Sequence, residues 1–118
     1  MDPPLTVLID ARNVLRSQWP NIPEDELVEL ARGWAADRGH RPVIVFDGRA
    51  PVQAPDVVGT GRESADDWLT REAARLAEAG EPFWLVTSDR ELRDRAGAGG
   101  CAERVIGGGS FARELTGR

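Results

Sequence analysis

The sequence predicts a single α/β domain spanning residues 1–118, in which a mostly parallel sheet lies between two layers of helices. Short apolar runs of strand length recur along the chain, which is typical of strands buried on both faces. Amphipathic segments separate most of these runs, and the resulting βαβ alternation predicts right-handed crossovers. A chain of 118 residues is long enough for one core but not for two.

Five strands are predicted, in chain order, at 5–10, 43–47, 56–59, 83–87 and 103–106. The first, second and fourth are near-continuous apolar runs (LTVLID, VIVFD and FWLVT), as expected for the centre of a parallel sheet. The other two, DVVG and ERVI, carry fewer apolar residues and are weaker predictions.

Four helices are predicted, at 24–38, 65–79, 89–96 and 110–116. The first has acidic residues in its first turn and Gly39 as its stop, which are common helix boundary signals. The second follows Ser64, a favourable N-cap, and the third follows Ser88, which we expect to cap it in the same way. The glycines of GGGS, at 107–110, favour a flexible connection before the last helix.

Composition and charge exclude several classes of protein. The net charge of −5 argues against a broad nucleic-acid-binding surface. All 15 basic residues are Arg, and the absence of Lys excludes P-loop and Schiff-base chemistry. Cys101 has no second cysteine with which to form a disulfide, which favours a reducing compartment. Because the chain shows neither a membrane-spanning run nor a signal peptide, we expect a cytoplasmic protein without membrane contact.

Carboxylates stand at the ends of three predicted strands: Asp10, Asp47 and Asp89. The carboxyl ends of parallel strands form the edge at which ligands bind in such sheets. Clustered carboxylates repel one another unless a cation lies among them. Oxygen ligands without His or Cys indicate a hard ion, so the sequence predicts Mg²⁺ or Mn²⁺ here. The alternative is that each residue only forms a turn or complements a helix dipole.

The start of the helix at 65–79 adds three further acids. Asp66 borders the apolar stripe of this helix and is expected to reach the strand ends. Asp67 lies nearly opposite the stripe and is expected to be solvated. A capping role beside Ser64 is enough to explain an acidic residue at this position. Glu63 precedes the cap and can turn either way.

The ordered motifs resemble a known family. They are Asp10 and Asn13 after the first strand, VFDG at 45–48, ESAD at 63–66, TSDR at 87–90, and a final helix with Phe111 and Leu115. Together, from residue 5 to about 115, they resemble the NYN domain in its YacP-like branch, within the PIN-like nuclease fold. Ala11 and Arg12 depart from that pattern, which usually has Gly and often an aromatic residue there.

The resemblance implies a PIN-like, Rossmann-like α/β/α sandwich with metal-dependent nuclease activity. Matched position by position, it implies that Asp10, Asp66 and Asp89 are catalytic carboxylates that bind the metal, with Glu63 and Asn13 as auxiliary ligands or as groups that support the ligands. Side chains that support these ligands would be Asn13, Asp47, Asp67 and Ser88. Metal-bound water supplies the nucleophile in such sites, so no His base is needed.

Five arginines fall in or near the loops at the predicted carboxylate edge: Arg12, Arg16, Arg49, Arg62 and Arg90. They predict a local rim that binds phosphate on an otherwise acidic protein. The alternative is that they only balance nearby acids. Trp19 presents a similar choice between stacking on a base and packing over its own loop.

The sequence therefore predicts a Mg²⁺- or Mn²⁺-dependent ribonuclease whose substrate is RNA, including structured or tRNA-like RNA. A protein partner or a homodimer would help so small and acidic a nuclease to recognise its substrate. The alternative function is a non-catalytic RNA- or protein-binding module that keeps the fold and a degenerate acidic pocket. An α/β phosphatase is a third reading, but Arg12 stands where its second Asp is expected.

Overall fold

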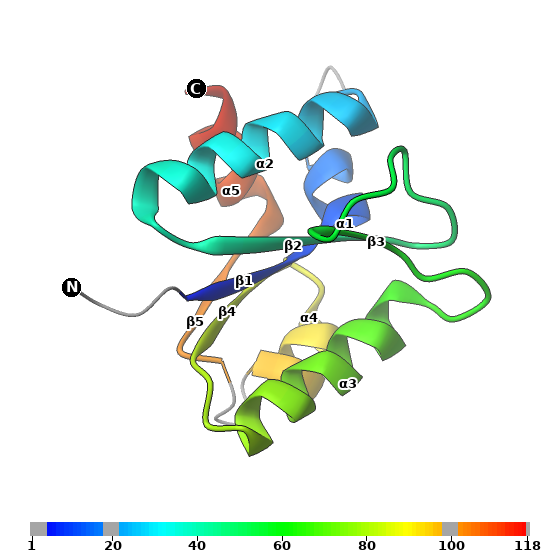
Figure 1. Cartoon of the computed structure of the whole chain (residues 1–118), viewed down its shortest axis with the longest axis vertical. Helices are drawn as coiled ribbons and strands as arrows, with labels where there is room; N and C mark the ends of the chain where they lie inside the picture. The colour runs from blue at the N-terminus through cyan, green and yellow to red at the C-terminus, as the bar shows by residue number, and fades with distance from the viewer. Residues whose placement is uncertain (1–4, 18–21, 98–101, 118) are drawn as a thin grey trace.

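A five-stranded, all-parallel sheet forms the centre of the molecule, with its strands in the order β3-β2-β1-β4-β5 (Figure 1). The computed structural model describes residues 5–17, 22–97 and 102–117. Trp19 and Cys101 lie outside the described residues. Among the described helices, none combines the length and apolar character needed to cross a membrane.

The strands are β1 (Thr6–Asp10), β2 (Arg41–Phe46), β3 (Val57–Gly59), β4 (Phe83–Val86) and β5 (Arg104–Ile106). The helices are α1 (Ala11–Arg16), α2 (Glu24–Arg38), α3 (Ala65–Glu78), α4 (Arg90–Leu92) and α5 (Gly108–Thr116), with a π-helical turn over Arg93–Gly97 after α4. The predicted α/β class and the parallel sheet are confirmed.

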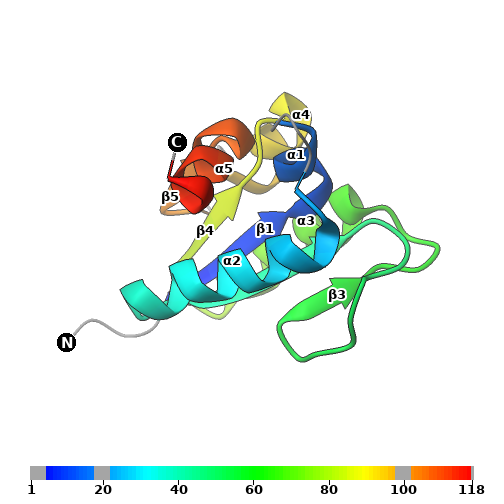
Figure 2. The ribbon, with the colours of Figure 1, turned by 90° about the horizontal axis from the view of Figure 1, so that it is seen from above.

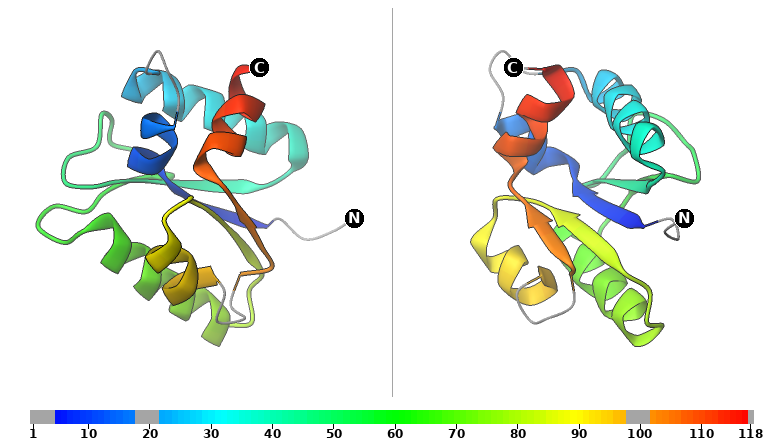
Figure 3. Two further views of the ribbon diagram at one scale, coloured as in Figure 1. Left: turned by 180° about the vertical axis from the view of Figure 1, so that it is seen from behind. Right: turned by 90° about the vertical axis from the view of Figure 1, so that its left-hand side faces the viewer.

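Helices cover both faces of the sheet, as the views in Figure 3 show. One face packs against α1, α2 and α5, and the other against α3, α4 and the π-helical turn. Alternate residues of β1 serve the two cores, because Val7 and Ile9 join one buried cluster while Leu8 joins the other. Burial on both faces explains the continuous apolar run in this strand.

The central strand β1 pairs with β2 on one side and with β4 on the other, with Asp10 opposite Val45 and Ile9 opposite Val86. The chain crosses from β1 to β2 by way of α2 on one face, and enters β4 from α3 on the other (Figure 2). The strand order therefore reverses at β1. In an open parallel sheet, the crevice beyond such a reversal is the usual place for a ligand.

Helix α1 is not among the predicted elements. A turn after Asp10 was the alternative that the sequence offered, but six residues from Ala11 to Arg16 form a helix that buries Ala11 and Val14. Only two of its residues are fully buried, so it carries too little periodicity to be recognised from the sequence. Its consequence is that Arg12, Asn13 and Arg16 leave the end of β1 from a helix rather than from a loop.

Two further differences concern helix starts. The GGGS segment is not a flexible connection, because α5 begins at Gly108 and the Phe111 amide donates to the Gly107 carbonyl at 2.9 Å. The predicted helix at 89–96 is α4 followed by the π-helical turn, and it is capped by Asp89 rather than by Ser88. Strand β2 ends at Phe46, which leaves Asp47 directly after the strand.

Candidate functional site

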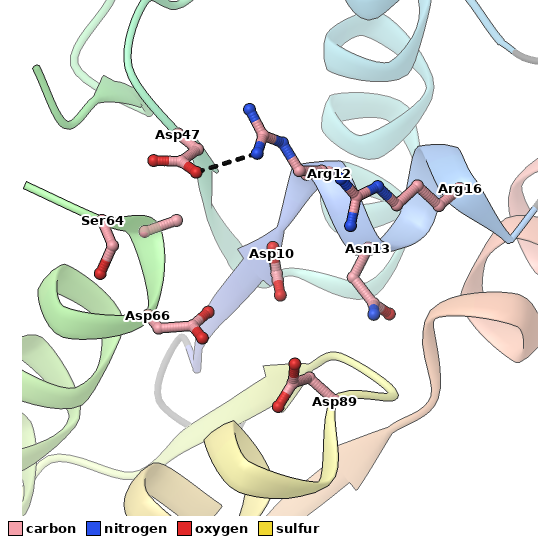
Figure 4. A pocket seen from close by; sticks show the side chains of 9 residues that line it. Asp10, Arg12, Asn13, Arg16, Asp47, Ser64, Asp66 and Asp89 are labelled. Carbon is pink, nitrogen blue, oxygen red and sulfur yellow. Dashed lines mark ion pairs between the residues drawn. The ribbon is translucent and has the colours of Figure 1, made fainter.

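A small pocket of about 180 Å³ lies at the carboxyl end of β1 (Figure 4). Four carboxylates line it, from four different parts of the chain: Asp10, Asp47, Asp66 and Asp89. Asp10 ends β1, Asp47 follows β2, Asp66 lies in the first turn of α3 and Asp89 precedes α4. The expected meeting of acidic strand ends and an acidic helix start is therefore found in one pocket.

Asp10 is the most buried of these acids, with 6% of its surface exposed. The Thr87 hydroxyl on the neighbouring strand end donates a hydrogen bond to Asp10 Oδ2 at 3.0 Å. Burial raises the pKa of Asp10 above its usual range, and this hydrogen bond opposes the rise. The pocket therefore holds a carboxylate that is poorly solvated and would gain from a nearby cation.

Asp66 and Asp89 point toward Asp10 across the pocket (Figure 4). Burial raises the pKa of Asp66, and the charge of Asp89 raises it further. Asp89 also caps α4, since its Oδ1 accepts a hydrogen bond from the Leu92 amide at 3.0 Å. This cap uses one carboxylate oxygen, so Asp89 can cap α4 and still offer its other oxygen to a metal ion.

These carboxylates do not form a ready-made metal centre. Within residues 5–17, 22–97 and 102–117, no three His, Cys, Asp or Glu side chains lie close enough together to hold a metal ion. The donor chemistry nevertheless fits a hard cation, because the pocket offers carboxylate oxygens and the pKa values of Asp10 and Asp66 are raised by burial and like charge. Binding an ion would require these side chains to move toward one another.

Asp47 forms an ion pair with Arg12, whose Nη1 lies 3.1 Å from Asp47 Oδ2 (Figure 4). Both side chains are partly exposed, so the pair contributes little to stability. It does give Asp47 an ion-pair partner within 4.0 Å, which the other three carboxylates of the pocket lack among the described residues. Asp47 is therefore the least suited of the four to accept a cation.

Asn13 supports the loop that carries Asp89. Its Oδ1 accepts a hydrogen bond from the Ser88 amide at 2.8 Å, and Ser88 Oγ accepts one from the Gly108 amide at 2.7 Å. A Cβ on Gly108 would overlap Asn13 Oδ1, so only glycine fits between α1 and the start of α5. Asn13 and Ser88 thus hold three segments together at the edge of the pocket.

Two of the predicted acidic residues lie outside this pocket. The carboxylate of Glu63 is held by the guanidinium of Arg71 through two hydrogen bonds. Asp67 is exposed, and its carboxylate accepts a hydrogen bond from Arg95 at 3.0 Å. Its backbone amide donates a hydrogen bond to Ser64 Oγ. The geometry agrees with the solvated capping position expected for Asp67 and does not support a ligand role for Glu63.

The five arginines of the predicted rim do not all line the pocket. Arg12 and Arg16 line the pocket, whereas Arg49, Arg62 and Arg90 are exposed and are not among its lining residues. Arg12 fits the alternative that these arginines balance nearby acids, because it pairs with Asp47. Arg16 has no carboxylate within 4.0 Å among the described residues, so its charge is available at the pocket mouth.

Thr87 and Gly108 were missed as site residues in the sequence. Thr87 is fully buried and bridges two acids, since its hydroxyl donates to Asp10 and accepts from the Asp89 amide at 3.1 Å. A threonine that ends an apolar strand just before an acidic residue was the available signal. Gly108 offered no comparable signal, because its closeness to Asn13 exists only in the folded chain.

Of the comparisons with known proteins, the one with solved structures finds a similar fold. No protein-family model matches the sequence. A search of curated proteins also gives no match. Among solved structures, the chain is similar to the crystal structure of a mutant of Rae1 (YacP) from Bacillus subtilis. The two share 23% identity with a TM-score of 0.74, over 96% of this chain and 76% of that one.

The chain has a YacP-like fold. This likeness bears out the predicted YacP-like fold, and membership of the NYN family and of the PIN-like nucleases stays a prediction. Identity of 23% between two chains that share a fold does not transfer an activity. The case for a function therefore depends on the pocket of this chain.

Proposed function

We propose that this protein is a divalent-metal-dependent ribonuclease, in which Asp10, Asp66 and Asp89 bind Mg²⁺ or Mn²⁺. The observation that carries the proposal is that these three carboxylates, from three separate elements, line one pocket at the reversal point of a parallel sheet. The YacP-like fold supports the proposal that the protein is a nuclease. The raised pKa values of Asp10 and Asp66 support a cation as the missing neighbour.

The carboxylates and the arginines of the pocket have separate parts in this proposal. Asp10, Asp66 and Asp89 would hold the divalent ion, which would supply an activated water and neutralise charge on the phosphate and the leaving oxygen. Asp10 is oriented by Thr87, and Asp89 by its own cap on α4, so both carboxylates are held in position along the pocket lining. Arg12 and Arg16, at the mouth, can bind a phosphate of the substrate strand.

The second candidate function is a non-catalytic RNA- or protein-binding module. The observation that favours it is that no three metal-binding side chains are already gathered in the described residues. Such a module would keep the arginines at the pocket mouth and bind RNA without cutting it. The cytoplasmic location, RNA as the substrate and a recognition partner remain predictions under either function.

Cleavage of a panel of structured and single-stranded RNAs, with Mn²⁺ or with EDTA, distinguishes the two. We expect cutting by the wild type in Mn²⁺ only, and its loss in Asp10→Asn, Asp66→Asn and Asp89→Asn. Asp37→Asn, an exposed acid on α2, is the matched control and should cut normally. Calorimetry with Mn²⁺ adds a readout independent of activity. Absence of both cutting and Mn²⁺ binding in the wild type would favour the binding module.

A further inference from the structure

A second hollow, of about 340 Å³, opens beside the acidic pocket. Its apolar wall is formed by Leu15 of α1, Ile22 and Pro23 before α2, and Phe46 at the end of β2. Leu15, Ile22 and Phe46 pack with one of the two buried clusters, so this wall is a surface of the core rather than a set of free side chains. The hollow is larger than the acidic pocket and differs from it in chemistry.

The two hollows share a border of three charged residues. Arg12, Arg16 and Asp47 line both of them. The ion pair between Arg12 and Asp47 stands on this border and keeps the Arg12 guanidinium between the two spaces. A ligand that occupied both hollows would therefore pass from carboxylates, across two guanidinium groups and Asp47, to a wall that is apolar apart from Glu24.

The groups of a nucleotide in single-stranded RNA complement these surfaces in the same order. Its phosphate is anionic and suits a cation and arginines, while its base offers a flat apolar face with polar edges. Guanidinium planes also stack on bases, which suits the position of Arg12 and Arg16. A base can enter such a hollow only after it leaves its stack, so a continuous duplex does not fit this arrangement.

We propose that the hollow bounded by Leu15, Ile22 and Phe46 is a base subsite, which receives the nucleobase adjacent to the phosphate held in the acidic pocket. The inference rests on the proposed function and deepens it, because it names unpaired RNA as the substrate at the point of cleavage. Continuity with the acidic pocket and the shared arginines favour a base over an apolar side chain of a protein partner.

Nuclear magnetic resonance titrations of the ¹⁵N-labelled protein in Mg²⁺ test the subsite without any cleavage. The probes are adenosine 5′-monophosphate and ribose 5-phosphate, which has the same sugar and phosphate but a hydroxyl group in place of the base. We expect the nucleotide to bind about fivefold or more tightly than the sugar phosphate, since burial of an apolar face adds on the order of 1 kcal/mol. The amide signals that move only with the nucleotide should be those of Leu15, Ile22 and Phe46.

Ile22→Ala removes part of the apolar wall and should bring the ratio of the two affinities close to one. Val52→Ala is the matched control, because Val52 is an exposed aliphatic residue of the loop after β2 that lines neither hollow. Leu15→Ala gives a second test of the wall. The spectra themselves report whether each variant is folded.

The outcomes separate this inference from the proposed function. Equal affinities for the two probes would overturn the base subsite, whether or not the same preparation cuts RNA in Mn²⁺. Preferential binding of the nucleotide by a protein that never cuts RNA would keep the subsite and remove the nuclease. If neither probe moves the signals of the wall, the subsite is wrong and a protein side chain becomes the better occupant.

Discussion

Thr87 and Asp10 form a buried hydrogen bond of 3.0 Å between the ends of two adjacent parallel strands. The same hydroxyl accepts the amide of Asp89, so one side chain sets the position of two of the proposed ligands. A threonine is suited to this role because its hydroxyl both donates and accepts. The orientation of the carboxylates is thus fixed by a residue that need not contact a substrate.

Replacing Thr87 tests this positioning role. Thr87→Val keeps the shape but leaves Asp10 and the Asp89 amide without their partner, so we expect a loss of about 1–2 kcal/mol in stability. Mn²⁺ affinity and cleavage should fall about tenfold, as for other groups that orient metal ligands. Thr87→Ser should restore both. Normal Mn²⁺ affinity in Thr87→Val, measured by calorimetry, would contradict the role.

Asp10→Asn should make the metal-free protein more stable at neutral pH. Burial raises the pKa of Asp10 in the folded state, so stability falls as the pH rises above the ordinary aspartate pKa, and the loss is complete above the raised pKa. The gain should be about 1–2 kcal/mol near neutrality and should vanish in acid, where Asp10 is protonated in both states. Thermal unfolding in EDTA across pH measures it. A variant less stable than the wild type at pH 7 would refute this prediction.

Gly108→Ala should disturb the acidic pocket from a distance. The new methyl group overlaps Asn13 Oδ1, and pushing Asn13 away releases the Ser88 amide. We expect a cost of about 1–3 kcal/mol, typical of overpacking. Gly109→Ala is the matched control, because a Cβ there meets its neighbours at an ordinary 3.7 Å. Adding Asn13→Ala to Gly108→Ala should relieve part of the cost, and additivity of the two changes would count against the clash.

Glu63→Gln and Asp66→Asn should differ in their effects on cleavage. Glu63 is engaged by Arg71 outside the pocket, whereas Asp66 lines it. We expect Asp66→Asn to lower kcat/KM more than tenfold, a barrier increase of at least about 1.4 kcal/mol, and Glu63→Gln to change it less than twofold. Equal losses in the two variants would show that Glu63 rotates into the site during catalysis.

The pair of Arg32 and Asp56 predicts a separate dependence of stability on pH. Two hydrogen bonds of 2.8 Å from Arg32 lower the pKa of Asp56 in the folded state. The stabilisation is therefore complete above the ordinary aspartate range and is lost as the pH falls through the lowered pKa. Both side chains are about a third exposed, so we expect only about 0.5–1 kcal/mol. Comparing denaturant unfolding of the wild type and Asp56→Asn at pH 7 and pH 3 measures it.

The predicted strands and the two long helices agree with the structure because their signals are local. Continuous apolar runs mark strands buried on both faces, and the stripe of Ala65, Leu69, Ala73 and Leu76 faces the core as expected. The cap of α3 by Ser64 is likewise a contact across three residues. Helix α1 and the early start of α5 were missed because short helices depend on packing against the rest of the fold.

The sequence alone determined that acidic residues follow the strands and that no His or Lys is available beside them, since residue type and strand position are local properties. Only the tertiary structure decided which acids meet. It placed Asp66 in the pocket and paired Glu63 with Arg71, because Asp66 lies in the first turn of α3 whereas Glu63 precedes the N-cap Ser64 and is outside the helix. It also brought Thr87 against Asp10, and Ser88 against Asn13 and Gly108, since these contacts depend on the order of strands in the sheet.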